Sequence, residues 1–187
     1  MSYRGPSIPT ARLLLSLLLI APGTAGAVVT CTVDNAVSPT IATCVGTTAR
    51  ETVRFDDNGV GFLRHTFGAG FNSNIDWDSS VPGDQKMPPN FNHQVRFDGG
   101  GGGDLVTVGN GTTTPASVLG TRFTFTGGSG PGDTLVLDDP DPTTNHTYYV
   151  QAGVLQVEGT VVFYEGVEQV TVNASTYAAT GDTINVY

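Results

Sequence analysis

The sequence predicts an all-β protein, and three observations lead to this fold class. Val, Thr, Gly, Asn and Asp are abundant, and these residues favour strands or the turns between them. No long window keeps apolar residues at the three-to-four spacing of an amphipathic helix. Apolar and polar residues instead alternate in short segments bounded by Gly, Asn, Asp or Pro, which is the pattern of half-buried strands.

Nine segments show this alternation, and each is expected to form a strand. They span residues 52–57, 94–99, 104–109, 121–127, 133–139, 154–159, 161–166, 168–173 and 182–187. A less regular stretch, residues 70–92, contains the only tryptophan, Trp77, and is predicted to be a long loop or insertion. We therefore expect an N-terminal β region with this loop at residues 28–92 and a repeat region at residues 93–187.

A short pattern, Gly-Asp-x-φ-x-φ with φ apolar, recurs in the second half. Its aspartates are Asp104, Asp133 and Asp182. Side chains two residues apart on a strand point to the same face, so the apolar positions are expected to face inward. These positions are Val106 and Val108, Leu135 and Leu137, and Ile184 and Val186. Repeats that each bury so little must stack to form a core, which predicts a parallel β-solenoid, with a β-sandwich as the alternative.

The first 27 residues have the features of a signal peptide. Arg4 and Arg12 give a basic start, residues 13–21 are apolar, and Ala-Gly-Ala at 25–27 fits a cleavage site. The apolar run is far shorter than the roughly 20 residues that cross a bilayer. We expect an exported protein, secreted or held at the cell surface, with no membrane span once the signal is removed.

The charge balance is strongly acidic. The formal net charge of −9 becomes −11 when Arg4 and Arg12 are removed with the signal peptide. Such a surface repels nucleic acid and attracts cations, so nucleic-acid partners are not expected.

The chain has two cysteines, Cys31 and Cys44, and both follow the expected cleavage site. Export favours an oxidising compartment, so we predict a disulfide between them. Two free thiols are the alternative.

The segments 161–175 (VVFYEGVEQVTVNAS) and 181–187 (GDTINVY) carry a resemblance to a known family. They resemble the repeated rungs of large secreted bacterial β-solenoid proteins that are described as having haemolysin-type calcium-binding repeats. The resemblance covers about residues 95–187. It implies an extracellular scaffold of stacked strands with calcium-binding repeats, and it does not imply an enzyme.

Four aspartates are candidate calcium ligands. Residues 99–107 (GGGGGDLVT) fit the calcium nonapeptide G-G-x-G-x-D-x-U-x, in which Asp104 supplies a charged oxygen. Asp133 follows a second glycine-rich loop, and Asp138 and Asp139 in "DDPDP" are expected to share a site with it. The alternative, which we favour for Asp104, is a glycine corner whose carboxylate accepts nearby backbone N–H groups, while the "DDPDP" acids form an ordinary solvated turn.

Together these features predict a structural or surface-interaction protein that presents a stiff acidic surface, with calcium as a stabilising ion. An uncovered edge strand at residues 182–187 would favour self-association. The alternative is a carbohydrate-active β-helix, either a polysaccharide lyase or a sugar-binding module. In that case Trp77, flanked by Asp76 and Asp78, would contact the sugar. We find no nucleophile-elbow or phosphate-loop motif, so a non-enzymatic role is favoured.

Overall fold

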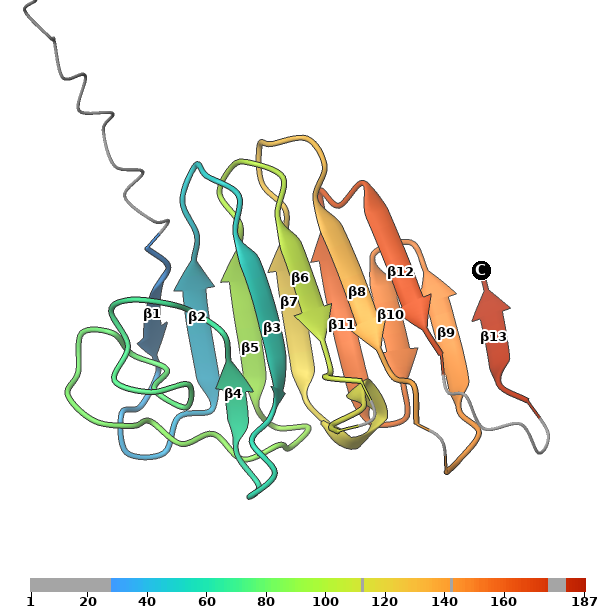
Figure 1. Cartoon of the computed structure of the whole chain (residues 1–187), viewed down its shortest axis with the longest axis horizontal. Helices are drawn as coiled ribbons and strands as arrows, with labels where there is room; N and C mark the ends of the chain where they lie inside the picture. The colour runs from blue at the N-terminus through green and yellow to red at the C-terminus, as the bar shows by residue number, and fades with distance from the viewer. Residues whose placement is uncertain (1–27, 112, 142, 175–180) are drawn as a thin grey trace, which may run out of the picture.

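The strands of this protein form two mixed β-sheets that lie face to face (Figure 1). The structure is a computed structural model that describes residues 28–111, 113–141, 143–174 and 181–187, so the expected signal peptide lies outside the described residues. The strands are β1 (Thr30–Val33), β2 (Ile41–Val45), β3 (Thr52–Asp57), β4 (Leu63–His65), β5 (Gln94–Asp98), β6 (Leu105–Val108), β7 (Arg122–Thr126), β8 (Thr134–Asp138), β9 (Thr147–Gln151), β10 (Val154–Val157), β11 (Thr160–Glu165), β12 (Gln169–Asn173) and β13 (Thr183–Val186). One 3-10 turn, η1 (Ala116–Val118), lies between β6 and β7.

The chain passes back and forth between the two sheets. Sheet A has the order β1-β2-β5-β7-β11-β10-β9-β13, and sheet B has the order β12-β8-β6-β3-β4. Four times a strand of sheet A is followed by a strand of sheet B, and we call these pairs units 1 to 4: β2–β3, β5–β6, β7–β8 and β11–β12. Equivalent strands of successive units pair in parallel in both sheets. In Figure 1 the four connections within the units lie together along one side of the molecule.

The register of these parallel strands places apolar side chains in columns between the sheets. In sheet B, Val53, Val106, Leu135 and Val170 are successive partners. The columns of sheet A hold, in order, Ala42, Val95, Phe123 and Val162, and Cys44, Phe97, Phe125 and Tyr164. Most of these side chains are fully buried. Burying such a side chain stabilises a fold by about 1.5–3 kcal/mol. Each unit therefore stabilises its neighbours by covering their core residues.

The end of the sheets nearest the N-terminus is covered. β1 pairs antiparallel with β2, and β4 pairs antiparallel with β3, so each sheet ends there in an added strand. The segment after β4 contributes Trp77, which is fully buried against Phe55 and His65. The predicted long loop is therefore a cover for the core of unit 1.

The disulfide predicted from the sequence is present. Cys31 in β1 and Cys44 in β2 are directly opposite each other in the antiparallel register and form a covalent bridge. Because it joins the covering strand to the first strand of unit 1, the bridge fixes β1 at the edge of sheet A.

All nine strands expected from alternation are present, but the third copy of the repeat does not behave as expected. β6 and β8 lie side by side in sheet B, whereas β13 pairs with β9 in sheet A. Ile184 and Val186 are 50% and 74% exposed, so the prediction that they face the core is wrong. The reason is that β13 lies at the outer edge of sheet A, where no described strand covers it.

Four strands were not expected, namely β1, β2, β4 and β9. β2 pairs with β5 and β3 pairs with β6, so strands on both sides of the expected boundary at residues 92 and 93 belong to the same two sheets.

Among the described residues, no helix is long and apolar enough to cross a membrane.

Candidate functional site

Four acidic residues stand at equivalent positions where the units turn from sheet A into sheet B. They are Glu51, Asp104, Asp133 and Glu168, and each lies within two residues before the sheet-B strand of its unit. We call them the acid stack. Asp104 and Asp133 are fully buried, Glu51 is 4% exposed, and Glu168 at the outer end is exposed.

Three of the four carboxylates, those of Asp104, Asp133 and Glu168, bind the backbone of the unit before their own. The N–H of Glu51 donates to Asp104 at 2.8 Å, the N–H of Asp104 donates to Asp133 at 2.7 Å, and the N–H of Asp133 donates to Glu168 at 2.7 Å. These bonds join residues 53, 29 and 35 positions apart. The carboxylate of Asp104 therefore accepts a backbone N–H, as expected if residues 99–104 form a glycine corner. That N–H belongs to the neighbouring unit and not to an Asx-turn within the corner itself.

Glycine is required opposite two of these carboxylates, those of Asp104 and Asp133. A Cβ on Gly99 would lie 2.0 Å from Asp104 Oδ2, and a Cβ on Gly127 would lie 2.5 Å from Asp133 Oδ2 and 2.1 Å from the carbonyl oxygen of Gly166. Real Cβ atoms do not approach oxygen so closely. Gly99 and Gly127, the first glycines of their corners, thus leave space for the carboxylates of Asp104 and Asp133.

Several carboxylate oxygens in the stack are buried without a hydrogen-bond donor. Glu51 Oε1 accepts the N–H and hydroxyl of Thr47 at 3.0 and 2.6 Å, but Glu51 Oε2, Asp104 Oδ2 and Asp133 Oδ2 have no hydrogen-bond partner. Burial, together with the neighbouring carboxyls of Glu51 and Asp133, raises the pKa of Asp104 to about 7, although the hydrogen bond from the Glu51 N–H acts in the opposite direction.

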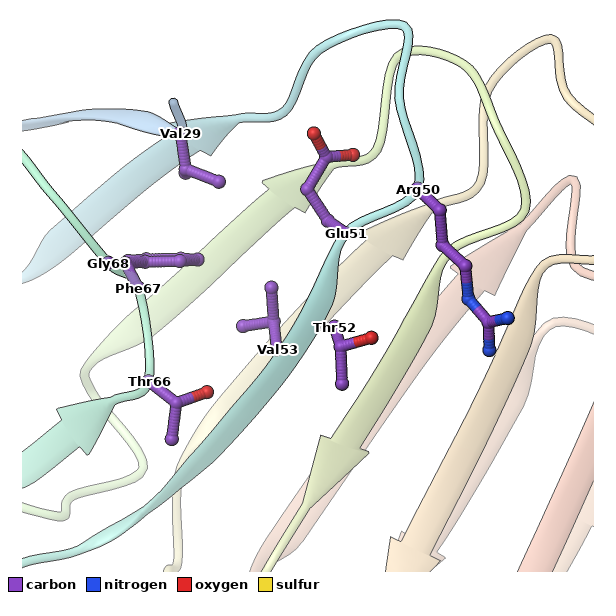
Figure 2. Close-up of a pocket in the computed structure, with 8 residues that line it drawn as sticks. All are labelled: Val29, Arg50, Glu51, Thr52, Val53, Thr66, Phe67 and Gly68. Atoms are coloured by element: carbon purple, nitrogen blue, oxygen red, sulfur yellow. The ribbon is translucent and has the colours of Figure 1, made fainter. Parts of the chain in front are cut away.

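A small hollow lies beside Glu51. Figure 2 shows Val29, Val53 and Phe67 pointing toward a common space, with Glu51 at its edge and the Arg50 side chain directed away. Its volume of about 160 Å³ is well below the roughly 300–1,000 Å³ of a typical small-molecule site. The hollow alone therefore does not define a substrate site.

The four predicted calcium ligands do not form one site, because Asp104 and Asp133 adjoin in the acid stack but Asp138 and Asp139 lie elsewhere. Asp133 precedes β8, while Asp138 ends that strand and Asp139 follows it, so a whole strand separates them. Asp138 accepts the N–H of Gly111 at 2.6 Å and the side-chain amide of Asn173 at 3.0 Å. Among the described residues, no group of three or more His, Cys, Asp and Glu side chains has an arrangement that would hold a metal ion. Calcium binding stays a prediction of the sequence.

Asp139 belongs to a separate buried network. Its Oδ1 accepts the N–H and hydroxyl of Ser117 at 2.8 and 2.6 Å. Its Oδ2 lies 2.7 Å from His146 Nδ1 and accepts the hydroxyl of Tyr148 at 2.8 Å. His146 also binds β13 through its backbone, which accepts from Thr183 at 3.1 Å. The network thus ties η1, β9 and β13 together, and both carboxylate oxygens of Asp139 are occupied by the protein.

Trp77, the predicted sugar contact, has no exposed surface. Its indole N–H donates to the carbonyl of Leu63 at 3.3 Å, and its ring packs on Phe55. The flanking carboxylates bind their own loop, since Asp76 accepts the N–H of Asn72 at 2.7 Å and Asp78 accepts the N–H of Ser80 at 2.9 Å. In this arrangement the ring offers no face on which a sugar could stack.

No protein-family model, curated protein or solved structure matches this chain. Sequence reasoning did not identify Glu51 and Glu168 as members of the stack. A usable signal was present, because each follows a corner glycine, Gly46 or Gly166, and precedes an alternating strand.

Proposed function

We propose that this chain is an exported structural protein, a short parallel β-solenoid that presents a stiff acidic surface and associates with a second copy of itself. The support for the solenoid is the repeated passage between two sheets with parallel pairing of equivalent strands in both. Export is supported by the disulfide, since such bonds form and persist in oxidising compartments.

The observation that carries the association is the difference between the two ends of the sheets. One end is covered by β1 and β4, whereas β12 and β13 at the other end have no paired strand on their outer side among the described residues. Unpaired edges expose N–H and C=O groups that pair readily with another strand. Ile184 and Val186 on β13 are exposed apolar side chains beside this edge.

The composition of these edges favours a second copy as the partner. The chain is strongly acidic, yet neither Gln169–Asn173 nor Thr183–Val186 carries a charged side chain. Protective edge strands usually carry charges that block pairing, and these edges carry none. Two acidic copies can therefore meet here without placing carboxylates opposite each other.

Sedimentation velocity over a range of concentrations tests this proposal. We expect the mature protein to associate, and Ile184→Lys to shift it to the monomer because a charge at the edge opposes pairing. Val37→Lys is the matched control, since Val37 is 93% exposed and lies between β1 and β2, and it should leave association unchanged. A monomer at high concentration, or equal association of Ile184→Lys and the parent protein, would contradict the proposal.

The carbohydrate-active alternative stays a prediction of the sequence, and its expected aromatic sugar contact, Trp77, is buried.

A further inference from the structure

Buried oxygens without a hydrogen-bond donor occur at equivalent corners of successive units of the acid stack. They are therefore a regular feature of these corners. Over Gly46 lie Glu51 Oε2 and the carbonyl oxygen of Gly99. Over Gly99 lie Asp104 Oδ2 and the carbonyl oxygen of Gly127. In each case two hydrogen-bond acceptors occupy the same small region, and a buried acceptor left without a donor is costly.

No basic side chain supplies the missing donor. The ion pairs of the described residues join Arg64 to Asp56 and His146 to Asp139 and Asp141, and none reaches the stack. Arg50 adjoins Glu51 in sequence but directs its side chain away (Figure 2). The remaining charged neighbours are acidic: Glu168 at the end of the stack, and Asp98 and Glu165 just before two of the corner glycines, all three exposed.

A proton meets the requirement of these buried oxygens. Asp104 accepts the backbone N–H of Glu51 at 2.8 Å, the second oxygen of each carboxyl is buried without a partner, and the neighbouring Glu51 carboxyl opposes ionisation of Asp104. Two carboxyls at one buried site retain a proton because both cannot be charged together. We propose that Glu51 and Asp104 form a proton-binding site, in which one proton is shared between the two carboxyls and joins unit 1 to unit 2.

The bound proton makes the junction pH-dependent. An aspartate in the unfolded chain has a pKa near 3.8, whereas burial and neighbouring carboxyls raise that of Asp104 to about 7 in the folded protein. Between these values the folded state holds a proton that the unfolded state has released. The contribution of the site is therefore fully present below about pH 4 and is lost as pH rises toward 7.

The test compares the melting temperature of the mature protein with that of Asp104→Asn from pH 5 to pH 8. Asn keeps an oxygen for the Glu51 amide and supplies a permanent N–H donor in place of the proton. We expect the melting temperature of Asp104→Asn minus that of the parent protein to increase by about 5 °C or more as pH rises from 5 to 8. Asp98→Asn, at an exposed corner carboxylate that accepts the N–H of Gly100 at 3.0 Å, is the control and should show no such gain.

A second measurement does not depend on stability. The side-chain carboxyl carbon of Asp104, followed by NMR, should titrate with a midpoint near pH 7 in the parent protein and at lower pH in Glu51→Gln. A midpoint below pH 5 in the parent protein, or a melting difference that is the same at every pH, would overturn the proposal.

Cations provide a further arm at pH 8. A rise in melting temperature caused by calcium but not by magnesium, and lost in Asp104→Asn, would place a metal ion where we place the proton and would also overturn the proposal. All of these measurements can be repeated in the Ile184→Lys background, in which association through β13 is expected to be absent. Failure of the proton-binding proposal is then distinguishable from failure of the association proposal.

Discussion

The carboxylate of Asp133 accepts the backbone N–H of Asp104 at 2.7 Å, and both residues are fully buried. The two aspartates are 29 residues apart and belong to successive units. This bond and its equivalents on either side connect all four units at the same corner.

Replacing Asp133 with Ala should destabilise the protein by about 1–3 kcal/mol, because the buried N–H of Asp104 would lose its acceptor. Urea unfolding monitored by circular dichroism measures the change. Asp98→Ala removes an exposed carboxylate from the preceding corner and should change the free energy of unfolding by less than about 0.5 kcal/mol. Equal effects of the two substitutions on the free energy of unfolding would show that the acid stack does not stabilise the fold more than an exposed carboxylate does.

Gly99→Ala should also destabilise the fold, by about 1–3 kcal/mol, because the new methyl group would lie 2.0 Å from Asp104 Oδ2. Gly68→Ala is the matched control, since no atom lies within 4 Å of the position of its Cβ. Thermal melting of both variants distinguishes a packing requirement from a general intolerance of alanine. The explanation fails if Gly99→Ala melts with the parent protein.

The buried imidazole of His65 should add a pH dependence of the opposite sign to that of Asp104. Burial lowers its pKa from 6.5 to about 4, while its Nε2 lies 2.6 Å from the carbonyl oxygen of Asp76. The unfolded state thus binds more protons between these values, so stability is full above pH 6.5 and falls as pH drops toward 4.

In Asp104→Asn, where the opposing titration is absent, we expect this loss to reach up to about 3 kcal/mol. NMR of the His65 ring carbons checks the assignment directly. The ring should be neutral at pH 5.5, and a midpoint near 6.5 would refute the prediction.

Reduction of the Cys31–Cys44 bridge should lower the free energy of unfolding by about 3 kcal/mol, the value expected for a closed loop of this length in the chain-entropy model. Melting with and without reductant measures it. The double variant Cys31→Ser/Cys44→Ser should melt like the reduced protein and ignore reductant. Freely alkylated thiols in non-reduced protein would contradict the bridge itself.

The strands with clear alternation could be predicted because a period of two is a local property. β5 and β7, for example, show their inward residues in the sequence itself, and their glycine-rich corners mark where they end. β2 and β9 were missed because "IATCV" and "TYYVQ" lack a clean alternation of apolar and polar residues, and pairing with neighbouring strands defines them.

The acid stack could be predicted only in part. Asp104 and Asp133 share the Gly-Asp pattern, but Asp182 shares it too and precedes β13 of the other sheet, where its carboxylate accepts the N–H of His146 at 3.0 Å. Glu51 and Glu168 have a longer side chain and a different preceding residue, yet they occupy the equivalent corner positions. Membership depends on which strands stack across intervals of 29 to 53 residues, and no local pattern records that.

Carboxylates of one unit bind the backbone of the unit before it, and this relationship defines the acid stack. Amide hydrogen exchange at Glu51, Asp104 and Asp133 measures this most directly. All three amides should be protected far more than that of Val37, whose N–H donates only to the exposed side chain of Asn35, and Asp133→Ala should remove the protection of the Asp104 amide first. Exchange of the three amides as fast as that of Val37 would contradict the account.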